Sequence, residues 1–234
     1  MIRALAVVPG DAVTKGQLGL VELNWYADTR PLHELIDSTK ATNPGALSKI
    51  GNAWLMCALG ERDAGAIEDA TNVYGENRPQ VGSNNISLTR LFLKGVAARI
   101  SKDEDKARSV FSAARAEQEK TVQAQPNHGP ALCVLGLIDA ALGRKEDALR
   151  EGRHAIKLLP PAKDSINGPA MIGYFAMIAA WVGNNDLACE QLAIAIRYPN
   201  SLSYGQLKLF PLWDPLRGDP RFEKIVASLA PKEN

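Results

Sequence analysis

The fold is indicated most clearly by residues 129–160, which read GPALCVLGLIDAALGRKEDALREGRHAIKLLP. Small residues recur where two helices would have to cross closely, at Gly136, Ala148 and Ala155. Pro160 follows the second helical pattern and would end it, because proline lacks a backbone N–H and disfavours a helical residue before it. The stretch therefore predicts two antiparallel helices that pack together as one unit.

The same offsets recur on both sides of this stretch. Gly95 and Ala107 occupy them upstream, and Ala176 and Ala188 occupy them downstream. The repeat length is 41 residues from Gly95 to Gly136. We therefore expect an all-α chain built from stacked helix pairs, with the extra length in long second helices and in the loops between units.

The chain is expected to form a single domain over residues 1–234. Within it, weak repeats cover 1–73 and clear repeats cover 88–200. An irregular loop rich in Gly, Asn and Pro separates them at 74–87 (YGENRPQVGSNNIS). Residues 201–234 are predicted to cap the array, because an uncapped end of a repeat protein exposes apolar surface.

Composition excludes several classes of function. The chain has 27 basic and 26 acidic residues, and this balance argues against a nucleic-acid partner. No apolar run reaches the roughly 18 residues of a membrane-spanning helix. We therefore expect a cytoplasmic protein that engages neither nucleic acid nor a membrane.

The cysteines and histidines form no recognisable chemical motif. Cys57, Cys133 and Cys189 lie far apart inside helical patterns, which is typical of free, buried thiols rather than of a disulfide framework or a zinc site. The three histidines show no metal-ligand spacing on one helix face; they are His33, His128 and His154. We accordingly predict no catalytic residues, no metal and no cofactor.

The offsets of small residues resemble those of the tetratricopeptide repeat (TPR) family, whose standard unit is about 34 residues long. This resemblance implies a right-handed superhelix, here of about five helix pairs with a C-terminal capping segment. It also implies a function, since such repeats bind other proteins and rarely catalyse reactions.

The C-terminal tail carries a more specific resemblance. Residues 204–231 contain WDPLRGDPRFEKI (Trp213–Ile225), and CALGERD lies upstream (Cys57–Asp63). Together they resemble the C-terminal TPR region of large bacterial regulators, in which a protein-kinase or winged-helix domain, often followed by a TolB-like segment, precedes the repeats. Ala4 and Pro9 are spaced as Ala155 and Pro160 are, so we interpret the chain as the C-terminal part of a longer protein.

The tail is interpreted as a cap on physical grounds. An apolar stripe with helical spacing is expected to close the array; it comprises Phe222, Ile225, Val226 and Leu229. Arg217 is expected to pair with Asp214 or Asp219 across the two turns that precede this stripe.

The resemblance also predicts which residues face inward on the first helix of each unit. These positions form an apolar strip with one charge: Phe92, Val96, Arg99, Cys133, Leu137 and Met177. We therefore expect a non-enzymatic module that binds an apolar or amphipathic peptide segment of a partner protein, or of another domain of its parent. On this interpretation, Leu137→Asp should abolish binding and spare the fold.

Three alternatives stay open. The strip is buried if tight curvature or the chain's own N-terminal helices cover it, which would make the chain a structural or intramolecular module. The N-terminal end is a candidate for self-association into a homo-oligomer. An enzyme with a pocket between the loop at 74–87 and the groove is the least favoured alternative.

Overall fold

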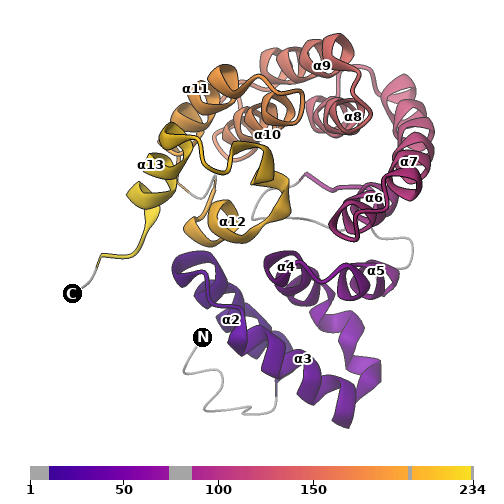
Figure 1. The fold of residues 1–234 in the computed structure, drawn as a ribbon, viewed down its shortest axis with the longest axis vertical. Helices are drawn as coiled ribbons and strands as arrows, with labels where there is room; N and C mark the ends of the chain where they lie inside the picture. The colour runs from indigo at the N-terminus through magenta and orange to yellow at the C-terminus, as the bar shows by residue number, and fades with distance from the viewer. Residues whose placement is uncertain (1–10, 74–85, 200–201, 233–234) are drawn as a thin grey trace.

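The computed structural model describes residues 11–73, 86–199 and 202–232, and these are all-α (Figure 1). The α-helices are α2 (Ala12–Tyr26), α3 (Arg30–Thr42), α4 (Gly51–Glu61), α5 (Ala64–Asn72), α6 (Arg90–Ile100), α7 (Glu104–Ala124), α8 (Gly129–Ala141), α9 (Lys145–Leu158), α10 (Asn167–Trp181), α11 (Asn185–Ala195), α12 (Tyr204–Leu209) and α13 (Pro220–Leu229). The two 3-10 helices are η1 (Pro44–Ile50) and η2 (Pro211–Leu216). Over the described ranges no strand forms.

Consecutive helices pack as antiparallel pairs, as the sequence predicts. The pairs are α2 with α3, α4 with α5, α6 with α7, α8 with α9, and α10 with α11. Figure 1 shows these pairs following one another around an arc, with α8 and α10 on its inner side and α7, α9 and α11 on its outer side. The fourth pair corresponds to residues 129–160, from which the pairing is predicted.

The close helix crossings explain the small residues. A Cβ at Gly136 would lie 3.0 Å from the backbone oxygen of Ala148, so α8 and α9 meet where the sequence places two small residues. At Gly95, a Cβ would lie 2.5 Å from the ring of Phe111 on α7. Both glycines allow an approach that a larger residue would prevent.

The turns between the two helices of a pair contain most of the predicted residues that end the first helix or cap the second. Gly143 and Gly183 follow α8 and α10 with φ of 78°, a conformation that favours glycine. Asp103 and Asn184 then cap α7 and α11 by accepting hydrogen bonds from backbone N–H groups. The turn before α9 differs, because Arg144 occupies the N-cap and makes no side-chain capping bond.

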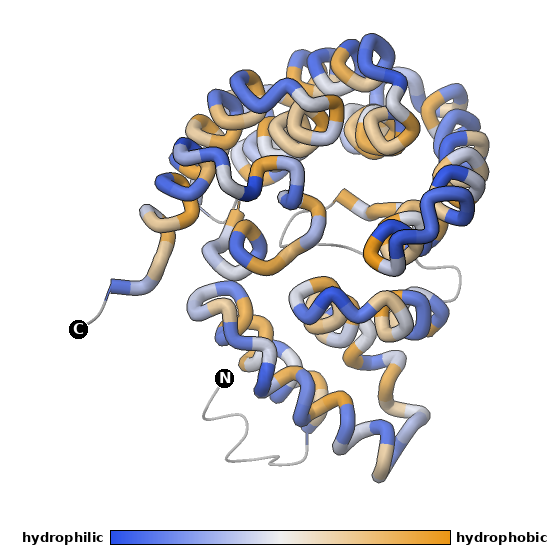
Figure 2. The backbone as a smooth tube through the Cα atoms, in the orientation of Figure 1, coloured by the Kyte–Doolittle hydropathy of each residue, from blue (hydrophilic) through white to orange (hydrophobic). Residues whose placement is uncertain are grey.

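Burial separates the inner helices from the outer ones. On α10 every residue from Gly168 to Ala180 is buried, and α8 is nearly as enclosed. On α9, by contrast, the buried residues are Ala148, Glu151, Gly152 and Ala155, and the other face is polar. Figure 2 shows this contrast as hydrophilic residues concentrated around the outside of the arc. The inner helices therefore have protein on both sides.

The C-terminal segment packs on both ends of the array of helix pairs. The predicted final helix forms as α13 and packs on α11, with Phe222 and Val226 of its stripe buried and Ile225 and Leu229 half-buried. The preceding part, α12 and η2, lies inside the arc (Figure 1), where η2 contacts α6 and α10, and α12 contacts α2 and α4. This segment joins the first helix pair to the last, an arrangement that the sequence analysis did not predict.

Two sequence-based expectations fall partly or wholly outside the described residues. The match between Ala4 and Pro9 lies within residues 1–10, and most of the predicted loop lies within residues 74–85. The last part of that loop is described, and there Ile86 is fully buried. Leu88, just after the loop, is fully buried as well.

A buried cluster of ionisable side chains joins helices α7, α8 and α9. Asp139 on α8 is fully buried, and its Oδ1 lies 2.6 Å from Arg115 Nε and 3.0 Å from Arg144 Nε. Glu151 on α9 shares a hydrogen bond with Asp139. Burial, together with the neighbouring Asp139 carboxylate, raises the pKa of the Glu151 carboxyl to about 8. The Glu151 carboxyl is therefore protonated at neutral pH.

We predict that Glu151→Gln flattens the dependence of stability on pH. The unfolded chain loses the Glu151 proton near pH 4.5, whereas the folded chain holds it up to about pH 8. The folded state thus binds more protons in this window, so this group makes the free energy of unfolding fall as pH rises through it. Glutamine keeps a hydrogen-bond donor and cannot ionise.

The measurement is urea denaturation of both chains at a series of pH values from 4 to 9. The difference in unfolding free energy, variant minus wild type, should grow with pH across the window and then level off. A difference that is constant with pH would contradict the raised pKa of Glu151.

Candidate partner-binding cleft

The predicted inner strip is part of the core. Five of its six residues are at most 6% exposed: Phe92, Val96, Cys133, Leu137 and Met177. Arg99 is half-buried. In this structure a peptide at these positions would have to displace protein that already covers them.

The contacts of Arg99 and its neighbours show how the strip is closed. Phe92 and Phe111 form an aromatic cluster with Trp181, with ring centroids 5.6 to 6.3 Å apart. The Arg99 guanidinium lies over the rings of Phe111 and Trp181 and donates to the carbonyl oxygen of Ala141 at 2.5 Å. Trp181 Nε1 donates to the carbonyl oxygen of Leu212 on η2 at 2.7 Å. The chain's own C-terminal segment thus contacts this part of the inner face.

The burial of Leu137 reverses the outcome expected for Leu137→Asp. Leu137 is 0% exposed, so an unpaired carboxylate there would cost several kcal/mol, a large part of the roughly 5–15 kcal/mol that stabilises a typical domain. We predict that the variant loses its cooperative thermal transition. Circular dichroism during heating measures this, with Ile166→Asp as the control because Ile166 is 70% exposed. A Leu137→Asp chain that melts like wild type would contradict the buried strip.

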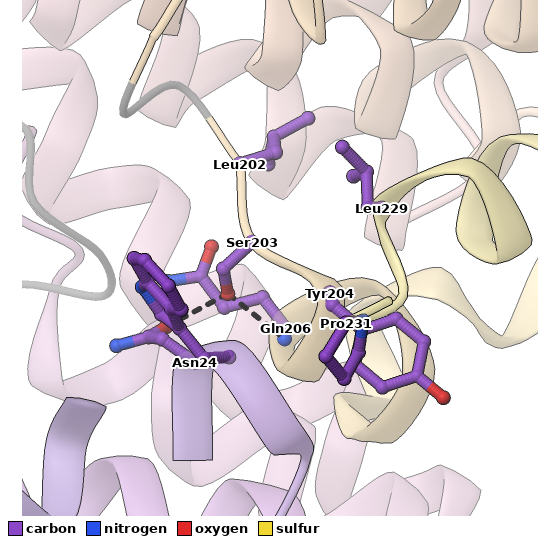
Figure 3. Close-up of a pocket in the computed structure, with 8 residues that line it drawn as sticks. Asn24, Leu202, Ser203, Tyr204, Gln206, Leu229 and Pro231 are labelled. Atoms are coloured by element: carbon purple, nitrogen blue, oxygen red, sulfur yellow. Dashed lines mark hydrogen bonds between the residues drawn. The ribbon is translucent and has the colours of Figure 1, made fainter. Parts of the chain in front are cut away.

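An open cleft lies elsewhere, where α2 meets the C-terminal segment. Its volume is about 480 Å³. Figure 3 shows Asn24 on one side, Ser203 and Gln206 on the segment that enters α12, and Leu202 and Leu229 further along. The lining residues are Asn24, Trp25, Leu202, Ser203, Tyr204, Gln206, Leu229 and Pro231. The walls therefore combine apolar side chains with amide and hydroxyl groups.

A small polar network holds the two walls together. Ser203 is the N-cap of α12, where its Oγ accepts from the backbone N–H of Gln206 at 3.2 Å. The same hydroxyl donates to Asn24 Oδ1 at 2.7 Å (Figure 3). Asn24 Nδ2 donates to the carbonyl oxygen of Leu20 at 2.7 Å. The two walls are therefore joined by one hydrogen bond between residues far apart in the sequence, and two local hydrogen bonds orient its partners.

Helix α2 presents exposed apolar and aromatic side chains, and one of them, Trp25, lines the cleft. Trp25 is 65% exposed and Tyr26 is 53% exposed. Val13 and Val21 are also exposed and stand at helical spacing on the same helix as Trp25. Exposed tryptophan and tyrosine next to a cleft are typical of protein-binding surfaces, which are enriched in these residues.

The polar groups that line the cleft are uncharged. Among its described lining residues are amide, hydroxyl and phenol groups, with no carboxylate, imidazole or thiol. The Lys208 ammonium stands at the edge and donates to the Tyr204 hydroxyl at 2.6 Å. Such walls bind a ligand that is partly apolar and partly hydrogen-bonding.

A second cluster appears between α3 and α4, and the sequence analysis missed it. His33, Cys57 and Glu61 place one potential ligand atom each within 4.8 Å of the others. Burial raises the pKa of the Cys57 thiol, and the Glu61 carboxylate raises it further, so this thiol is a poor nucleophile. His128 and His154 do not join the cluster. One sequence signal could have indicated the cluster: Cys57 and Glu61 are four residues apart and therefore lie on the same face of one helix.

Comparison of the chain with protein-family models and with curated proteins finds no match. Within the described ranges, no helix combines the length and the apolar character needed to cross a membrane.

Proposed function

We propose that the chain is a non-enzymatic protein-interaction module of the tetratricopeptide type, which binds an apolar or amphipathic segment of a partner protein. The partner is a separate protein or another domain of the parent. The observation that carries the proposal is the cleft beside α2, which is open and rimmed by Trp25, whereas the predicted inner strip is closed.

The form of the cleft supports a peptide as its ligand. Leu202, Leu229 and Pro231 offer apolar contact, and Gln206 offers an amide group that can bond to a peptide backbone. A tryptophan at the rim is the residue type that most often dominates binding energy at interfaces. Association would rest on burial of these side chains, at roughly 25 cal/mol per Å² before ordering costs.

We predict that Trp25→Ala weakens binding of a selected peptide at least tenfold, or by about 1.4 kcal/mol. Peptides would be selected from a random displayed library on the wild-type chain, and their affinities measured by isothermal titration calorimetry. Ile166→Ala serves as the matched control, because Ile166 is also a large, exposed apolar residue and lies outside the cleft.

The proposal fails if the selected peptides bind Trp25→Ala as tightly as wild type, or if selection enriches no peptide. Both variants should keep the wild-type circular dichroism spectrum, since Trp25 and Ile166 are exposed.

Self-association is the second candidate, and the exposed stripe on α2 favours it. Val13, Val21 and Trp25 would meet the same stripe of a second copy across a two-fold axis. Sedimentation velocity over a dilution series separates the two candidates. A dimer that dissociates on dilution, and that Trp25→Ala abolishes, would assign the stripe to self-association.

A further inference from the structure

The cluster between α3 and α4 combines three kinds of metal ligand. His33 comes from α3, and Cys57 and Glu61 come from consecutive turns of α4. His33 Nδ1 lies 3.1 Å from Glu61 Oε1 and 3.0 Å from Glu61 Oε2. The cluster is separate from the cleft, because none of its residues lines that cleft.

We propose that His33, Cys57 and Glu61 form a binding site for a divalent cation of the zinc class. The site would use His33 Nδ1, Cys57 Sγ and one Glu61 carboxylate oxygen, and would leave a fourth position to water. Mixed nitrogen, sulfur and oxygen ligands suit zinc, whereas Mg²⁺ and Ca²⁺ take oxygen ligands.

The distances fit this coordination. Two ligand atoms about 2.0 Å from zinc at a tetrahedral angle stand roughly 3.3 Å apart, close to the observed separation of His33 Nδ1 from the Glu61 oxygens. The Cys57 sulfur lies within 4.8 Å of both groups, and a metal would draw it inward. His33 and Glu61 are exposed, so a cation can reach the site from solvent.

The other ring nitrogen of His33 supports the same assignment. His33 Nε2 lies 3.3 Å from Asp37 Oδ2, one helical turn away on α3. A metal on Nδ1 requires the proton on Nε2, and the Asp37 carboxylate would accept that N–H. Metal-bound histidines nearly always donate their second N–H to a carboxylate, a carbonyl or water in this way. Asp37 is thus a positioning residue for the proposed site.

Metal binding at this site would release protons from the ligands. The cation displaces the proton of the Cys57 thiol and any proton on His33 Nδ1, and both are released to solvent. One thiolate, one carboxylate and a neutral imidazole then balance the two positive charges. The bound metal would link α3 to α4, beside the turn where Arg62 pairs with Asp214 of the C-terminal segment.

The test is titration of the reduced, chelator-treated full chain with Co²⁺, followed by displacement with Zn²⁺. We expect tetrahedral cobalt bands in the visible region and a thiolate-to-cobalt charge-transfer band in the near ultraviolet. Cys57→Ser should lose the charge-transfer band, and His33→Ala should weaken binding at least tenfold. Asp37→Asn should weaken it by about 10- to 100-fold. Mg²⁺ and Ca²⁺ should not compete.

The matched controls are Cys189→Ser and His154→Ala, which change a cysteine and an exposed histidine outside the cluster and should leave the spectrum unchanged. The proposal is overturned if cobalt gives no charge-transfer band, or if the band persists in Cys57→Ser. If Cys57→Ser fails to fold, the exposed-site variant Glu61→Gln decides the question. Undiminished Co²⁺ affinity in that variant overturns the proposal, and affinity at least tenfold weaker supports it.

Discussion

The structure depends on one close approach, between Gly205 at the start of α12 and the backbone of α2. A Cβ at Gly205 would lie 1.8 Å from the carbonyl oxygen of Leu23, so the two helices meet at a distance that only glycine permits. The hydrogen bond from Ser203 to Asn24 holds the same junction, and the ion pair of Arg62 with Asp214 at 2.5 Å fastens η2 to the end of α4 nearby. Through this junction the last part of the chain is fastened to the first helix pair.

The junction explains why the inner strip is closed and the cleft is open. Because α12 is held against α2, the following η2 helix lies inside the arc, and Trp181 bonds to Leu212 there. The same docking leaves a hollow between α2 and the segment around Ser203, with Trp25 at its rim. The docking of α12 thus underlies both the contact of η2 with α6 and α10 and the cleft beside Trp25. The proposed binding surface would be lost with the junction.

Local sterics made the helix pairs predictable from the sequence. Gly136 and Ala148 must be small because their helices touch, and Gly143 ends α8 through its own backbone conformation. The exposure of the strip could not be predicted in this way, because it depends on a segment that returns from the end of the chain. The tail stripe correctly predicted α13, whereas the docking of Gly205 on Leu23 has no local pattern. The cleft likewise joins residues from separate helices, and in the second cluster spacing relates Cys57 to Glu61 on α4 but does not bring in His33 from α3.

The most direct test of this account is the unfolding free energy of Gly205→Ala, measured by urea denaturation beside Gly65→Ala. The added methyl group at 205 meets backbone that cannot rotate away, so we expect the free energy of unfolding to fall by about 1–3 kcal/mol. Gly65 lies in α5 with room for a methyl group, and its substitution should stabilise the chain by about 0.5–1 kcal/mol. A Gly205→Ala chain as stable as wild type would contradict the closure of the array by α12.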